Sequence, residues 1–143
     1  MNVSTEQPGT ERKLDAGHVV AIGWVLCAVA LVERVPRLTA GRRYLLCHAS
    51  SALDHLTLTA LALVTAAGVA ALAGAIMMQS KDSYRPALPV VWLVVVVVLL
   101  VAADGVDAHG EALAAQLSAT PFSEAACDYA PQDYIATPGW YFW

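Results

Sequence analysis

The chain has 143 residues, of which 58% are hydrophobic and only 14% are charged, whereas a soluble domain of ordinary composition is about half apolar and about a quarter charged. The hydrophobic residues are concentrated in long uncharged runs, which is typical of membrane-spanning segments and argues against a soluble globular domain. The net charge of −4, with every Lys and Arg inside the first 85 positions, argues against binding to nucleic acid.

Residues 1–15 are polar and show no periodicity, which predicts a flexible N-terminal tail. The first apolar run follows at 16–32 and is short for a span, since about 20 apolar residues match the hydrocarbon thickness. Two interpretations stay open: a retained transmembrane helix, or a signal peptide with Ala28, Val29 and Ala30 as an A-x-A cleavage site. We favour the retained helix because the polar leader is long.

The connector at 33–51 is rich in arginine, with Arg34, Arg37, Arg42 and Arg43. Four Lys and Arg residues also flank the opposite ends of the three apolar runs, so the positive-inside rule gives a tie. Because the charges of the connector are the densest and flank two spans, we predict that the connector and the C-terminal tail face the cytoplasm.

The run at 56–78 contains 23 residues without a charge and is the clearest helix in the sequence. Small residues recur four apart in two adjacent stripes, which comprise Ala66, Ala70 and Gly74 and then Ala67, Ala71 and Ala75. Small side chains let helix backbones approach closely in lipid, where no hydrophobic force drives helices together. The stripes predict a helix-packing face, although a general abundance of Ala would produce the same pattern.

The third apolar run, 87–103, is rich in Val and Leu and has no polar stripe, which predicts a lipid-facing span. The remaining residues, 104–143, contain six acids and no Lys or Arg. Prolines in this segment argue against a long regular element, and only 111–117 reads as a short helix. The aromatic residues at 140–143 predict a contact with the bilayer surface or with a partner subunit.

The sequence therefore predicts an all-α, polytopic membrane protein with three transmembrane helices, at about 16–32, 56–78 and 87–103, and a mostly irregular C-terminal tail. We expect it in the cell membrane. Its immediate surroundings are then the lipid bilayer and either a membrane-protein partner or a second copy of the chain.

Motifs for catalysis or cofactor binding do not occur. Cys27, Cys47 and Cys127 have neither CxxC nor CxxCH spacing, and their odd number predicts no closed disulfide framework. The sequence also has no Gly-rich phosphate loop, HExxH pattern or EF-hand loop. We therefore predict no enzyme, no metal site and no cofactor.

Ionisable residues do gather at one predicted membrane face, because three spans bring the end of the first, the start of the second and the end of the third together. This boundary cluster comprises Glu33, His55, Asp104, Asp107 and His109. Carboxylates and imidazoles can bind cations or pass protons. The simpler interpretation, which we favour, is that they are ordinary residues at the points where helices leave the lipid.

We expect a small integral membrane protein that acts through helix packing as a non-enzymatic accessory or interaction subunit of a membrane assembly. The alternative is a small proton- or cation-linked transporter, or an oligomeric pore-forming protein. Its ionisable residues would come from the boundary cluster.

Overall fold

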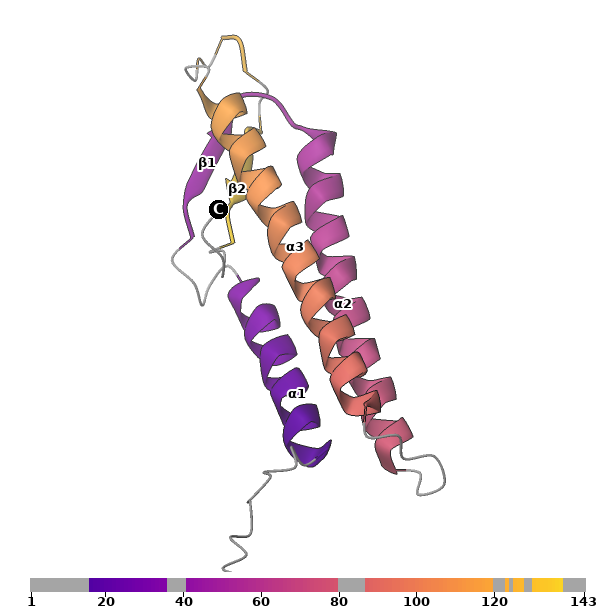
Figure 1. Cartoon of the computed structure of the whole chain (residues 1–143). Helices are drawn as coiled ribbons and strands as arrows, with labels where there is room; N and C mark the ends of the chain where they lie inside the picture. Colours follow the sequence, from indigo (N-terminus) through magenta and orange to yellow (C-terminus); the bar gives the residue numbers. More distant parts are fainter. Residues whose placement is uncertain are drawn as a thin grey trace, which may run out of the picture.

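The computed structural model describes residues 16–35, 41–79, 87–119, 123, 125–127 and 130–137, and helix makes up 75% of them. The elements follow in the order α1 (Ala16–Glu33), β1 (Arg43–Leu46), α2 (Ser51–Gln79), α3 (Leu88–Ser118) and β2 (Gln132–Ile135). Figure 1 shows the three helices side by side, with both strands next to the C-terminal part of α3. The predicted N-terminal tail and the aromatic residues at 140–143 lie outside the described residues.

Two helices are long and apolar enough to span a membrane, Ser51–Met78 with 28 residues and Leu88–Ser118 with 31. At about 1.5 Å per residue these helices measure roughly 42 Å and 46 Å, whereas the hydrocarbon core of a bilayer is about 30 Å thick. α1 is apolar too, but its 18 residues reach only about 27 Å. The two long helices thus exceed a bilayer core by about two and about three helical turns.

The third helix extends beyond the predicted span of 87–103. α3 continues through Ala103 to Ser118, so the tail, in which only 111–117 was predicted as a short helix, begins with 15 helical residues, 104–118. The acids that interrupt the apolar run do not end the helix, because they lie against neighbouring elements: Asp104 is only 7% exposed, and Asp107 forms an ion pair with Arg34.

Small side chains fill the centre of the three-helix bundle. Its buried cluster takes Cys27 and Ala30 from α1, and from α2 and α3 it takes Val64, Ala67, Ala71, Val96, Leu100 and Ala103. The outward surfaces stay apolar, with Leu58, Val69 and Val98 each at least 60% exposed. Helices that are apolar on every side are typical of a protein surrounded by lipid.

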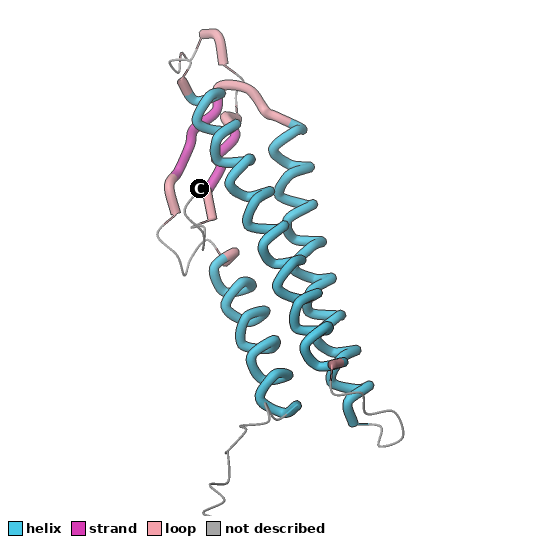
Figure 2. The backbone as a smooth tube through the Cα atoms, in the orientation of Figure 1, coloured by secondary structure: helices cyan, strands magenta, loops and turns pink. Residues whose placement is uncertain are grey.

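A short two-stranded sheet was not predicted. β1 pairs antiparallel with β2, and Tyr44 lies opposite Tyr134. Figure 2 shows the two strands beside the end of α3, where Leu46 packs with Leu53 of α2 and Ala114 of α3 in a second buried cluster. A two-stranded sheet is marginally stable alone, so its attachment to the helices matters.

A disulfide joins the segments that carry the two strands, and this corrects the expectation drawn from the odd number of cysteines. Cys47 directly follows β1, and its Cα lies 4.6 Å from that of Cys127, 80 residues along the chain. The third cysteine, Cys27, is buried in α1. We call residues 41–50, 123–127 and 130–137, where the structure describes them, the cap.

Candidate functional site

A largely buried ion pair joins α1 to α3 just below the cap. Arg34 follows the last residue of α1, and its Nη2 donates to Oδ2 of Asp107, with the two side chains 14% and 11% exposed. Arg34 Nη1 also donates to the carbonyl oxygen of Ala30 at 2.9 Å. The Nε of Arg34 is buried and makes no hydrogen bond to the described residues, so the guanidinium is only partly satisfied.

The structure brings together three members of the predicted boundary cluster. Glu33 and Asp107 each lie within electrostatic range of both Arg34 and Asp104. The other two members, His55 and His109, are exposed. Within the described residues, no three His, Cys, Asp or Glu side chains are placed to hold a metal ion.

Sequence reasoning missed the role of Arg34, because it was counted only as a charge that sets orientation. The signal was present in the chain: an arginine directly follows an apolar helix, while acids interrupt another apolar run at Asp104 and Asp107. Charges at such positions are costly in lipid unless they are paired. The three carboxylates and Arg34 therefore form a polar layer between the apolar helices and the cap.

Polar contacts also hold the cap against α3. Oε1 of Glu111 accepts hydrogen bonds from the Tyr44 hydroxyl at 2.9 Å and from Arg42 Nη1 at 3.1 Å. The Tyr134 side chain lies beside Gly110, where an added Cβ would come within 2.6 Å of the Tyr134 hydroxyl oxygen. Gly110 thus lets the ring approach the helix backbone. The pKa of Tyr134 is raised, mainly because its hydroxyl is buried and to a smaller extent because acidic side chains and Tyr44 lie nearby.

Gln132 of β2 connects the cap to the start of α2. Its Oε1 accepts a hydrogen bond from the backbone N–H of Ser50 at 2.7 Å, and its Nε2 donates to Oδ1 of Asp54 at 2.9 Å. Nearby, Arg43 and Asp133 form a longer, exposed ion pair at 3.6 Å. The second strand is therefore attached to both long helices and to β1.

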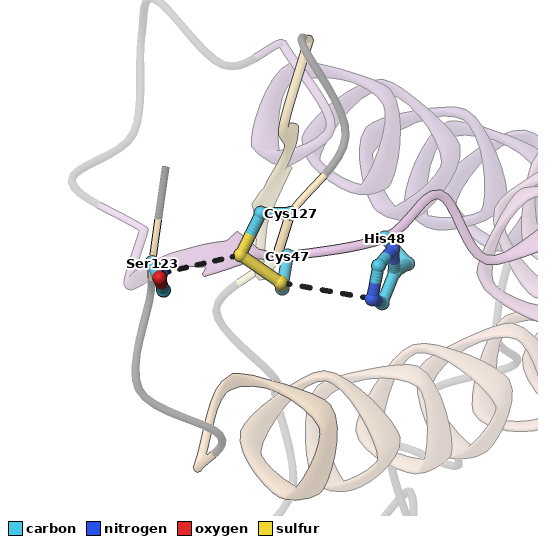
Figure 3. Close-up of a disulfide and its surroundings, with 4 residues drawn as sticks. All are labelled: Cys47, His48, Ser123 and Cys127. Atoms are coloured by element: carbon cyan, nitrogen blue, oxygen red, sulfur yellow. Dashed lines mark hydrogen bonds between the residues drawn. A yellow bond between two sulfur atoms is a disulfide. The ribbon is translucent and has the colours of Figure 1, made fainter. Parts of the chain in front are cut away.

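The disulfide at the edge of the cap has polar neighbours. Figure 3 shows His48 beside Cys47 and Ser123 beside Cys127. His48 Nε2 lies 3.7 Å from Cys47 Sγ, and the backbone N–H of Ser123 donates to Cys127 Sγ at 3.3 Å. The surroundings of this bond are thus more polar than the interior of the helical bundle.

The small-residue stripes of α2 divide between the inside and the outside of the bundle. Ala67, Ala71 and Gly74 are buried, and Gly74 lies so close to Trp92 of α3 that an added Cβ would be 3.3 Å from the indole Cγ. The other three members of the predicted set are half-buried or exposed, namely Ala66, Ala70 and Ala75. One part of the set thus packs against helices of the same chain.

An open apolar groove runs along the outer face of α2. Its lining combines large and small side chains and comprises Leu58, Leu61, Ala62, Thr65, Ala66, Val69, Ala70, Ala73 and Trp92. The Thr65 hydroxyl donates to the carbonyl of Leu61 at 2.8 Å, so it adds little polarity to the groove. We call this surface the α2 groove.

The described residues thus form a polar layer, a disulfide-bonded cap and an apolar outer groove. Comparison of the chain with protein-family models, with curated proteins and with solved structures finds no match.

Proposed function

We propose that this chain is a multi-pass membrane protein that acts as a non-enzymatic interaction subunit, and that it receives a helix of another membrane-protein chain in the α2 groove. The observation that carries this proposal is the alternation of small and large side chains along the exposed face of α2. Ala62, Ala66 and Ala70 lie in one row, and Leu58 and Val69 stay 63% exposed beside them. Such rows allow close backbone approach between helices in lipid.

Transport is supported less well by the geometry. The carboxylates around Arg34 lie at one end of the bundle. Between the three helices, the buried cluster consists of apolar residues and Cys27. The hydroxyls of Thr57, Thr59 and Thr65 donate to carbonyls of their own helix at 2.7 to 2.9 Å, as expected for threonines inside a helix. A transport pathway needs polar groups along the spans.

We also propose that the cap lies on the extracytoplasmic side, opposite to the orientation predicted from the arginines. The numbers of Lys and Arg on the two sides of the predicted spans are equal, so they do not decide the orientation. Disulfides, in contrast, persist in oxidising compartments and are rare in the cytosol. The disulfide favours an oxidising compartment for both the connector and the C-terminal segment, because it joins Cys47 to Cys127.

The interaction is tested with a photoreactive amino acid placed at Leu58, a large and exposed residue of the α2 groove, and in a matched protein at Val98, an equally exposed position of the apolar run of α3. Irradiation of native membranes should give a protein adduct of defined mass at position 58 and none at 98. The additional substitution Ala66→Leu should reduce the adduct at 58, since it replaces a small residue that lines the groove.

Equal lipid labelling at both positions, with no protein adduct, would remove the interaction proposal. Cation or proton flux in liposomes that Glu33→Gln and Asp104→Asn abolish would favour the transporter instead. Mass spectrometry of the adduct distinguishes a second copy of the chain from a different protein.

Orientation has a separate test, in a Cys27→Ala background in which the disulfide stays intact. A membrane-impermeant maleimide should label Asp133→Cys in right-side-out vesicles, and Ala87→Cys, at the exposed start of α3, only after the vesicles are opened. The reverse pattern would place the cap in the cytoplasm.

A further inference from the structure

The two sulfurs of the disulfide differ in their surroundings. Cys47 is 9% exposed and lies next to the exposed ring of His48, whereas Cys127 is half-buried and belongs to an exposed turn. In that turn the backbone N–H groups of Ala126 and Cys127 both donate to the carbonyl oxygen of Ser123, at 3.0 and 2.9 Å. The two polar neighbours, His48 and Ser123, lie at opposite ends of the sulfur–sulfur bond (Figure 3).

We infer that the Cys47–Cys127 bond is a thiol–disulfide exchange site, which a dithiol opens and an oxidised dithiol closes. A disulfide becomes more oxidising when its environment stabilises the thiolates that form on reduction. The Nε2 atom of His48 lies 3.7 Å from Cys47 Sγ, close enough to donate a hydrogen bond to the thiolate that forms there. The N–H of Ser123 places a hydrogen-bond donor 3.3 Å from the other.

The exposed fractions of the two cysteines indicate which sulfur is attacked first. A thiolate of the dithiol attacks Cys127 Sγ, since Cys127 is the more accessible residue, and forms a mixed disulfide while Cys47 leaves as a thiolate beside His48. The second thiol of the dithiol is deprotonated and attacks the dithiol sulfur that is bonded to Cys127. This releases Cys127 as a thiolate, which accepts a hydrogen bond from the Ser123 N–H. Both thiolates then take up protons. Two electrons pass from the dithiol, which leaves as a disulfide.

Opening the bond loosens the attachment of the second strand. In the closed form, Cys47 follows Leu46 directly, and Leu46 lies opposite Gln132 in the sheet, so the disulfide fixes the end of the ladder. Without it, β2 depends on a two-stranded ladder, which is marginally stable, and on a few side-chain contacts. The inferred chemistry does not depend on any partner at the α2 groove.

The experiment uses the full chain in detergent micelles with Cys27→Ala, equilibrated in buffers of reduced and oxidised dithiothreitol. Maleimide gel shifts give the fraction opened and its rate. We expect His48→Ala to slow opening by about tenfold and to shift the equilibrium by about tenfold toward the disulfide, since a less stabilised thiolate is a poorer leaving group. His48→Lys, which places a nitrogen donor near the same sulfur, should recover most of the lost opening rate and of the lost opened fraction. His109→Ala, an exposed histidine on α3, is the matched control and should change neither.

Hydrogen exchange on the same samples separates opening from unfolding. We expect the opened wild type to exchange faster at 132–136, including the Ala136 N–H that donates to the carbonyl of Arg42 at 2.8 Å, while α2 and α3 stay protected. A bond that opens only when α2 and α3 also lose protection would be a purely structural link and would overturn the inference. Identical rates and equilibria in His48→Ala and His109→Ala would overturn it equally.

Discussion

Removal of Asp107 should destabilise the fold far more than removal of any exposed acid of the cap. Asp107→Ala leaves Arg34 without its carboxylate in a position where the two side chains are only 14% and 11% exposed. Breaking a buried pair by removing one partner costs about 3–5 kcal/mol, because the remaining charge stays desolvated. At the lower end this is a change of roughly a hundredfold in the folding equilibrium constant.

The assay is an unfolding titration in mixed micelles, followed by circular dichroism. Asp133→Ala is the matched control, since its pair with Arg43 is 3.6 Å long and 46–72% exposed, and an exposed pair contributes only about 0–1 kcal/mol. The double variant Arg34→Met with Asp107→Leu removes both charges and should recover stability to within about 1–2 kcal/mol of the wild type.

The cost in Asp107→Ala arises from an unpaired charge only if the double variant is clearly more stable than the single one. A double variant as unstable as Asp107→Ala would refute the reasoning. So would an Asp107→Ala protein no less stable than Asp133→Ala, because the ion pair would then contribute nothing beyond a surface contact.

Three further predictions concern close contacts of the helices and the cap. Gly110→Ala should lower the free energy of unfolding by about 1–3 kcal/mol, because its Cβ would meet the Tyr134 hydroxyl at 2.6 Å. Adding Tyr134→Phe should restore most of that loss. A double variant without recovery would contradict the contact. Because the pKa of Tyr134 is raised, its contribution to the free energy of unfolding is fully present below the unfolded pKa of about 10 and is lost as the pH rises through the folded pKa. Phenolate absorbance should therefore develop at higher pH in the folded than in the unfolded protein. Tyr134→Phe should remove the component that titrates at the higher pH. Gly74→Leu should destabilise the chain by a few kcal/mol by displacing Trp92, and the exposed substitution Ala66→Leu should leave thermal unfolding unchanged.

The helices were the part of the fold that could be predicted from sequence. Apolar runs without charge placed the beginnings of α1 and α3 and most of α2, because membrane helices must satisfy their backbone groups internally and cover them with apolar side chains. The end of α3 could not be found in this way. Asp104 and Asp107 interrupt the apolar run, but a helix tolerates acids that are buried against another element or paired across to one.

The cap was not predictable, since its stability depends on contacts between segments that are distant in sequence. The strands are four residues each, too short for a pattern of alternation, and the pairing of Cys47 with Cys127 depends on α3 returning to the start of α2. For the candidate site, the three-span topology predicted that Glu33 and Asp104 lie at one level, and the structure places these two carboxylates within electrostatic range of each other. It did not reveal Arg34 as the partner of Asp107.

The disulfide turns part of the chain into a closed covalent loop. Residues 47–127, with all of α2 and α3, form a ring from which α1 is excluded. A protease cut between the two long helices therefore leaves the pieces linked until a reductant is added. If the chain spans the membrane as proposed, Cys127 must reach the side of the membrane that holds Cys47 before the bond can form, so ring closure follows insertion of both long helices.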